Sequence, residues 1–126
     1  MKGFINLIKP SGMSSAYAVG KVKKKLNSPC GHMGTLDPMA TGVLPVFIGR
    51  ATVLSSYLLE ADKRYKAEIK LGVATDTCDI TGNVISEKPV NVKTETLNSV
   101  LEKFKGTIKQ TPPMFSAIKK DGVRLY

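Results

Sequence analysis

The chain has 126 residues, 42% of them hydrophobic, which is enough for one modest core, so a single domain is expected. Nineteen Lys and Arg against ten Asp and Glu give a net charge of +9. This excess is typical of proteins that bind nucleic acid, although a solvated basic surface has the same composition. No run of about 18 apolar residues could span a membrane, and no signal-peptide pattern develops, so we expect a cytoplasmic protein.

The two cysteines, Cys30 and Cys78, lie far apart in the sequence, and neither belongs to a Cys-x-x-Cys pair. A disulfide framework or a zinc site would need more cysteines or a closer spacing. We therefore expect reduced thiols, no metal and no cofactor.

The start of the chain predicts a strand followed by a basic helix. Residues 3–8 predict the strand, and Ser14 begins a serine pair that can cap a helix over residues 15–26. Apolar residues share one face of that helix, and lysines crowd the remainder. Lys21 and Lys24 are therefore candidates for phosphate contacts, although these lysines could equally serve solubility alone.

The rest of the chain interleaves strand and helix patterns irregularly, with hairpin signals instead of regular βαβ units. Such a pattern predicts an α+β domain with a mainly antiparallel mixed sheet flanked by helices. In chain order we expect a strand at 44–48, a helix at 51–61, a strand at 64–71, a loop at 73–82, a strand at 84–85, a helix capped by Thr94 and stopped by Gly106, a strand at 107–110 and a hairpin at 115–126 turning at Asp121-Gly122.

The most informative segment is residues 31–46, GHMGTLDPMATGVLPV. It sets one carboxylate, Asp37, among glycines, prolines and small hydroxyl residues, and its apolar residues would anchor the loop to a core. Glycines permit strained backbone and close approach of a ligand. Asp37 is therefore a candidate catalytic group, although an Asp-Pro pair can also simply open a turn.

This segment resembles the signature of the bacterial TruB family of tRNA pseudouridine synthases. Other segments agree with the family in the same order along the chain, so the resemblance covers essentially all of it. They are LIKPSGMSS at 7–15, DKRYKA at 62–67, TDTCD at 75–79, and PPMFSAIK at 112–119 with Gly122, Leu125 and Tyr126. The resemblance implies the N-terminal half of the pseudouridine-synthase fold.

The resemblance also implies how the domain is divided. Residues 1–126 would form the N-terminal part of one catalytic domain, with residues 111–126 as the start of an RNA-clamping thumb. The rest of the catalytic domain and any C-terminal RNA-binding domain would lie outside this chain. The family's arginine partner of the catalytic Asp would lie there too, so we expect this chain alone to be inactive or nearly so.

By resemblance, Asp37 is the catalytic nucleophile, Tyr65 stacks on the target base or acts as a general base, and His32 contacts the RNA beside the flipped nucleotide. Without the family, Tyr65 would be interpreted as strand packing and His32 as a water-facing loop residue. The remaining RNA-binding candidates are Lys9, Lys21, Lys24, Lys63, Arg64, Lys119 and Arg124. Of these, Lys9 is expected to support the site more than to react. Lys119 and Arg124 could equally be exposed charges of a hairpin.

The implied reaction converts uridine 55 in the T-loop of tRNA into pseudouridine. The T-arm is the expected partner of a monomeric enzyme, and the stacked uridine would have to be flipped out at a cost of a few kcal/mol. A carboxylate can add to the anomeric carbon or help to deprotonate C2′ toward a glycal, and both routes stay open.

Two other function classes are compatible with the residues. One is a basic RNA-binding or RNA-chaperone module that needs no catalysis. The other is a retaining nucleoside or glycoside hydrolase that uses Asp37, which the lack of a second carboxylate in the loop disfavours.

Overall fold

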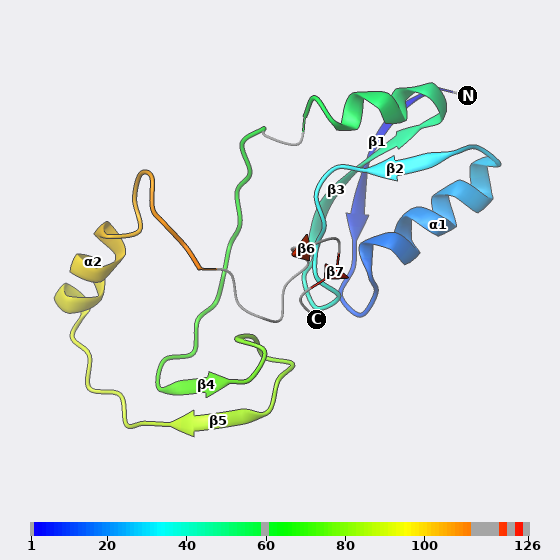
Figure 1. Cartoon of the computed structure of the whole chain (residues 1–126). Coiled ribbons are helices and arrows are strands. Elements are labelled where there is room, and N and C mark those ends of the chain that lie inside the picture. The colour runs from blue at the N-terminus through cyan, green and yellow to red at the C-terminus, as the bar shows by residue number, and fades with distance from the viewer. Residues whose placement is uncertain (1, 59–60, 112–118, 121–122, 125–126) are drawn as a thin grey trace. The chain divides into compact units, whose positions relative to one another are not determined.

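The computed structural model describes residues 2–58, 61–111, 119–120 and 123–124 (Figure 1). The chain divides into two units, Met1–Tyr65 and Lys66–Tyr126. Both units combine helix with antiparallel strands, so the expected α+β class is confirmed.

The first unit contains a three-stranded antiparallel sheet. Its central strand is β3 (Gly42–Ile48), with β1 (Gly3–Lys9) on one side and β2 (Cys30–His32) on the other. β3 is the most buried strand, which fits its apolar sequence GVLPVFI, because a central strand is covered by both neighbours. β2 is missed by the sequence patterns, since three residues around a glycine carry no periodicity.

Helix α1 (Ser15–Leu26) packs its apolar face on this sheet. The Ser14 hydroxyl accepts a hydrogen bond from the Tyr17 amide at 3.2 Å, which is the expected N-cap. Asn27 ends the helix in the left-handed region, with φ 45°. The buried core joins three residues of these elements, Val19, Leu44 and Val46.

The expected helix at 51–61 is wrong. The structure has a short 3-10 helix, η1 (Gly49–Ser55), followed by turns. Two hydroxyls bond to carbonyls three residues back, from Thr52 to Gly49 at 2.9 Å and from Ser55 to Thr52 at 2.7 Å. Such side-chain bonds compete with regular helix geometry, and the exposed apolar residues here gain little from packing.

In its described residues, the second unit has two hairpins and a helix. β4 (Val73–Thr75) pairs with β5 (Val84–Glu87), α2 (Thr94–Glu102) follows, and β6 (Lys119–Lys120) pairs with β7 (Val123–Arg124). The pairing of β6 with β7 confirms the expected terminal hairpin, whose turn lies outside the described residues.

Several expectations for the segment after η1 are wrong. Residues 64–70 and 107–110 form no strand, because no described strand pairs with them, and alternation alone cannot supply a partner. β4 lies inside the expected loop. α2 is capped by Lys93 without a side-chain bond, instead of by Thr94.

Local hydrogen bonds close the β4–β5 hairpin. The Asp79 carboxylate accepts from the Thr81 hydroxyl at 2.6 Å, the Thr77 hydroxyl at 2.8 Å and the Thr81 amide at 2.8 Å. Hydrogen bonds to the charged form, from Thr81 first and Thr77 next, lower the pKa of Asp79 below its usual 3.8.

Each unit contains one free cysteine. Cys30 on β2 is half-buried and donates its S–H to the Ser28 carbonyl at 3.4 Å, whereas Cys78 is exposed, with φ 62°. In the part of the chain that the structure describes, no three His, Cys, Asp or Glu side chains gather into a metal site. No helix within those ranges has the length and apolarity to cross a bilayer.

Candidate active site

Asp37 lies in the loop between β2 and β3 and is exposed. Its backbone carbonyl accepts a hydrogen bond from the Ala40 amide at 3.0 Å, so the backbone does form the turn that Asp-Pro suggests. The carboxylate itself has no hydrogen bond or salt bridge with any residue in the described ranges. The turn therefore presents a carboxylate that is available to a ligand.

Lys9 holds this loop from inside the unit. Its side chain is completely buried, and its ammonium donates to the carbonyls of Met13 at 2.8 Å, Pro10 at 2.9 Å and Pro38 at 3.3 Å. Three acceptors satisfy the three donors of an ammonium, which is what makes its burial tolerable. Because no donor is left for a phosphate, this geometry agrees with Lys9 as a support and not with a direct RNA contact.

Two serines hold the same loop on both sides of Asp37. The Ser15 hydroxyl, in a residue only 2% exposed, donates to the Leu36 carbonyl and accepts from the Leu36 amide, both at 2.9 Å. The Ser11 hydroxyl donates to the Met39 carbonyl at 2.9 Å. Sequence reasoning did not single out these contacts, although both serines lie in the LIKPSGMSS segment.

His32 and Lys63 also lie at the loop. His32, half-buried at the end of β2, has its Nδ1 2.5 Å from the Gly34 carbonyl, which requires Nδ1 to carry the hydrogen. The Nε2 of a neutral ring is then a free acceptor. A β-carbon at Gly34 would lie 3.9 Å from Lys63 Cε, so the lysine side chain passes beside the loop.

The other predicted site residues are not joined to Asp37 by a described interaction. Tyr65 is 70% exposed, lies in no strand and has no hydrogen bond or ring contact within the described ranges. The rest are Arg64, exposed in the same irregular segment, Lys21 and Lys24 on the C-terminal half of α1, and Lys119 and Arg124, whose backbones pair in the second unit.

Comparison with known proteins gives the loop a context. The family described as "TruB family pseudouridylate synthase (N terminal domain)" matches residues 22–126. Among similar curated proteins, tRNA pseudouridine synthase B of Azoarcus sp. (strain BH72) is 53% identical over 98% of this chain and 42% of its own length. The protein of the same name from Shewanella amazonensis is 51% identical over 98% of this chain and 40% of its own length.

Solved structures agree with that match. A Cbf5-Nop10-Gar1 complex contains a chain that is 32% identical, with a TM-score of 0.63 over 93% of this chain and 31% of that one. The archaeal box H/ACA sRNP Nop10-Cbf5 complex gives 35% identity and a TM-score of 0.62 over 84% of this chain and 29% of that one. The chain thus spans about two fifths of the curated relatives' length.

Proposed function

Since the chain belongs to the TruB pseudouridylate synthase family, we propose that it is the N-terminal part of the catalytic domain of a tRNA pseudouridine synthase. The proposed substrate is uridine 55 in the T-loop of tRNA. What carries the proposal is the loop geometry, in which Asp37 is exposed on a loop whose backbone is held by the side chains of Lys9, Ser11 and Ser15. Cytoplasmic location and a monomeric state stay predictions.

In the proposed reaction the N1–C1′ bond of the uridine breaks, the uracil turns, and a bond forms between C5 and C1′ while C5 loses a proton and N1 gains one. The reaction is an isomerisation and needs no net oxidant or reductant. Asp37 would add to C1′ as a nucleophile or take a proton from C2′ toward a glycal. Either role needs a carboxylate that the ribose can reach, and Asp37 is exposed.

His32 and Tyr65 would hold the flipped nucleotide. The free Nε2 of a neutral His32 can accept a hydrogen bond from a ribose hydroxyl or from the N–H of a base. The exposed ring of Tyr65 offers a stacking surface, and its hydroxyl could serve as a general base. Stacking and phosphate contacts from Lys63 and Arg64 would repay the few kcal/mol that base flipping costs.

We also propose that this chain alone is inactive or nearly so. The charge partner implied by the family for Asp37 would lie outside the chain, and Asp37 has no basic partner among the described residues. An unpaired carboxylate lacks the fixed orientation and electrostatic bias that a nucleophile needs.

The test is tritium release from a tRNA transcript labelled at uracil C5, because forming the new glycosidic bond displaces that hydrogen. The samples are this chain, its Asp37→Asn variant, and each of them mixed with the C-terminal half of a curated relative. We expect release only from the mixture with the unchanged chain. Release from the chain alone at the rate of a full-length relative would contradict its inactivity.

A non-catalytic basic RNA-binding or RNA-chaperone module is the second candidate, and the net charge of +9 favours it. Under this alternative, Asp37→Asn would leave function intact, whereas neutralising the lysines of α1 would abolish it. No tritium release from any mixture, with circular dichroism confirming that both halves fold, would favour this candidate over the synthase.

A further inference from the structure

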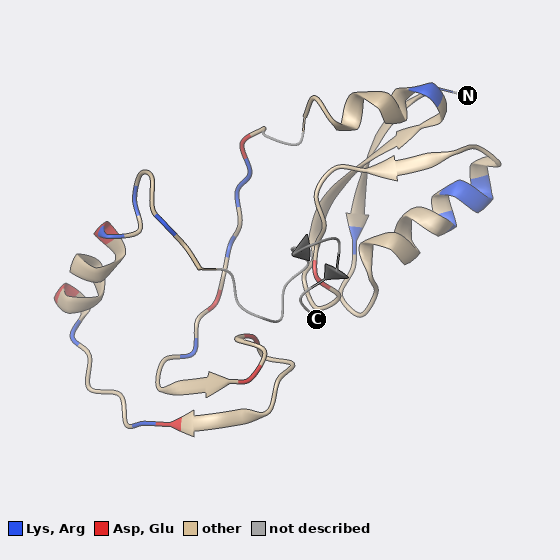
Figure 2. Ribbon diagram, viewed as in Figure 1, with Lys and Arg blue, Asp and Glu red and all other residues tan. Residues whose placement is uncertain are grey.

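A basic surface surrounds the C-terminal end of α1. Figure 2 shows lysines gathered on the last turns of this helix, whose sequence SAYAVGKVKKKL holds no Asp or Glu. Lys2, just before β1, and Arg50, just after β3, extend the surface beyond the helix. We call this set of exposed cations the α1 basic surface; its members are Lys2, Lys21, Lys23, Lys24, Lys25 and Arg50.

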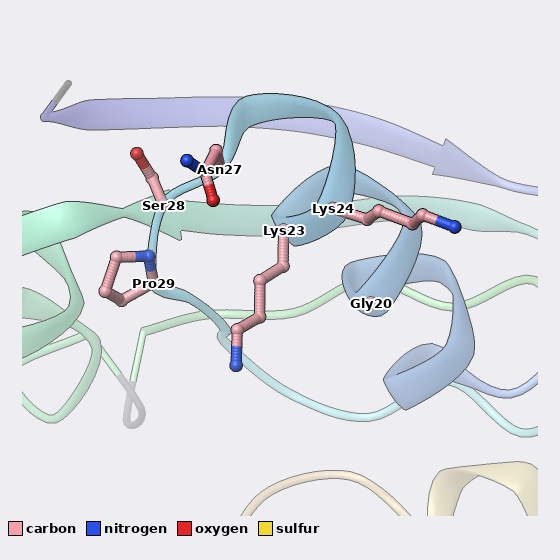
Figure 3. A pocket seen from close by; sticks show the side chains of 6 residues that line it. All are labelled: Gly20, Lys23, Lys24, Asn27, Ser28 and Pro29. Atoms are coloured by element: carbon pink, nitrogen blue, oxygen red, sulfur yellow. The ribbon is translucent and has the colours of Figure 1, made fainter.

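Three adjoining hollows run across the α1 basic surface. The first, about 370 Å³, lies at the helix end, where the side chains of Lys23 and Lys24 extend in different directions (Figure 3). A second of about 740 Å³ shares Lys24 and adds Tyr17, and a third of about 730 Å³ shares Pro29 with the first. A connected series of open hollows suits an extended polymer better than a single small anion.

The charges of this surface are uncompensated. Lys21 lies 5.0 Å from the centre of the Tyr17 ring, and the other five cations have no side-chain hydrogen bond or ion pair within the described ranges. Asp37 is the only Asp or Glu in residues 2–58. Lysines in the last turn of a helix also interact favourably with the helix dipole. That role cannot explain Lys2 and Arg50, which lie outside the helix.

The surface lies at the opposite end of the first unit from Asp37. β1 begins directly after Lys2 and ends at Lys9, whose ammonium bonds to the Pro38 carbonyl, and β3 runs from the Asp37 loop toward Arg50. α1 starts at Ser15, which bonds to Leu36, and its twelve residues extend roughly 18 Å away from that contact. Three elements therefore separate the α1 basic surface from the loop, and one nucleotide cannot contact both.

We infer that the α1 basic surface binds the backbone phosphates of a helical RNA segment that lies outside the target loop. The inference rests on the proposed function for the identity of the RNA. Helical RNA presents closely spaced phosphates, and clustered Lys and Arg neutralise them with release of counterions and a steep salt dependence. Phosphate contacts of this kind fix where the RNA lies without reading its sequence, so they would orient the substrate relative to Asp37.

The experiment measures binding of this chain to a fluorescent RNA duplex that has no loop and therefore no T-loop uridine. The test variant is Lys23→Gln/Lys24→Gln/Arg50→Gln. The matched control is Lys70→Gln/Lys88→Gln/Lys93→Gln, which removes the same charge from exposed positions of the second unit. Fluorescence anisotropy is recorded from roughly 50 to 200 mM salt.

The test variant should bind the duplex about tenfold more weakly, and its slope of log Kd against log salt should fall by about two to three. The control should change Kd less than about threefold. Equal weakening in both variants would assign the effect to net charge and overturn the inference. An absence of duplex binding by the unchanged chain at low salt would also overturn it.

Two further measurements separate the remaining outcomes. Binding to vesicles that contain anionic lipid tests a membrane role for the surface. If the test variant lost vesicle binding, the control variant kept it, and RNA binding was unchanged, the inference would be overturned. Because the duplex has no target uridine, its binding is independent of tritium release, so this inference and the proposed function can fail separately. If circular dichroism shows that the first variant does not fold, Lys21→Gln/Lys24→Gln/Lys25→Gln replaces it.

Discussion

Each of the two units is stabilised internally by a different kind of interaction. All buried residues within residues 2–58 and 61–111 belong to the first unit, whereas residues 66–111 of the second unit are all at least partly exposed. The first unit carries nine Lys and Arg against three Asp and Glu, and the second carries ten against seven. Hydrophobic burial thus fixes the shape that presents Asp37, while local hydrogen bonds and strand pairing shape the second unit.

The largest expected contrast comes from equivalent truncations in the two units. Leu44→Ala removes a side chain that is 1% exposed and should lower the free energy of unfolding by about 2–5 kcal/mol. Leu101→Ala removes one that is 48% exposed on α2 and should cost less than about 1 kcal/mol. Urea denaturation followed by circular dichroism measures both, and equal losses would contradict the contrast.

Removing the buried ammonium should have the next largest effect. Lys9→Met keeps the length of the side chain but leaves three carbonyls without their donor, so we expect a loss of about 2–3 kcal/mol. Lys24→Met, at an exposed position on α1, is the control and should stay within about 0.5 kcal/mol. If Lys9→Met left the free energy of unfolding unchanged, the three carbonyls would have to be satisfied in another way.

Two neighbouring serines allow a finer test within the first unit. Ser15→Ala should cost about 1–2 kcal/mol and speed hydrogen exchange of the Leu36 amide, because that amide donates to the Ser15 hydroxyl. Ser14→Ala should cost about 1 kcal/mol through the lost helix cap and leave the Leu36 amide protected. Faster Leu36 exchange in both variants would mean that helix fraying, and not the serine contact, controls the loop.

The smallest expected effect is a pH dependence in the second unit. Since the folded pKa of Asp79 is lowered, its carboxylate stabilises the β4–β5 hairpin above pH 3.8, and this stabilisation is lost as the pH falls through the folded pKa. Carboxyl chemical shifts and hairpin amide shifts should follow one titration below pH 3.8. Asp79→Asn should abolish that step, and an unchanged profile would assign the titration to another group.

How far the sequence predicts the fold depends on whether an element is stabilised by local interactions or by distant partners. The predicted helix at 15–26 matches α1, because a serine cap and an apolar face are features of the segment itself. The predicted strand at 3–8 also matches β1, although its partner β3 is distant in the sequence. Residues 64–71 alternate as a strand should, but alternation does not say which strand would pair with them. The helix expected at 51–61 fails because its serine and threonine hydroxyls bond locally.

The candidate site is predicted only partly, for the same reason. The glycine-rich loop identifies Asp37 as an exposed carboxylate, and the LIKPSGMSS segment contains all three residues that hold the loop. The pairing of Ser15 with Leu36 joins positions far apart in the chain, and no sequence periodicity marks such a contact. The burial of Lys9 could not be predicted either, because an isolated lysine is ordinarily expected at the surface.

The single thiol in each unit makes the unmodified chain suitable for distance measurements in solution. Exposed Cys78 should react first with a maleimide reagent, and half-buried Cys30, which donates to a carbonyl, should react later. Sequential labelling would then place a donor dye on the second unit and an acceptor dye on the first without any added cysteine. Energy transfer between the dyes would report how far apart the two units are before and after tRNA is added.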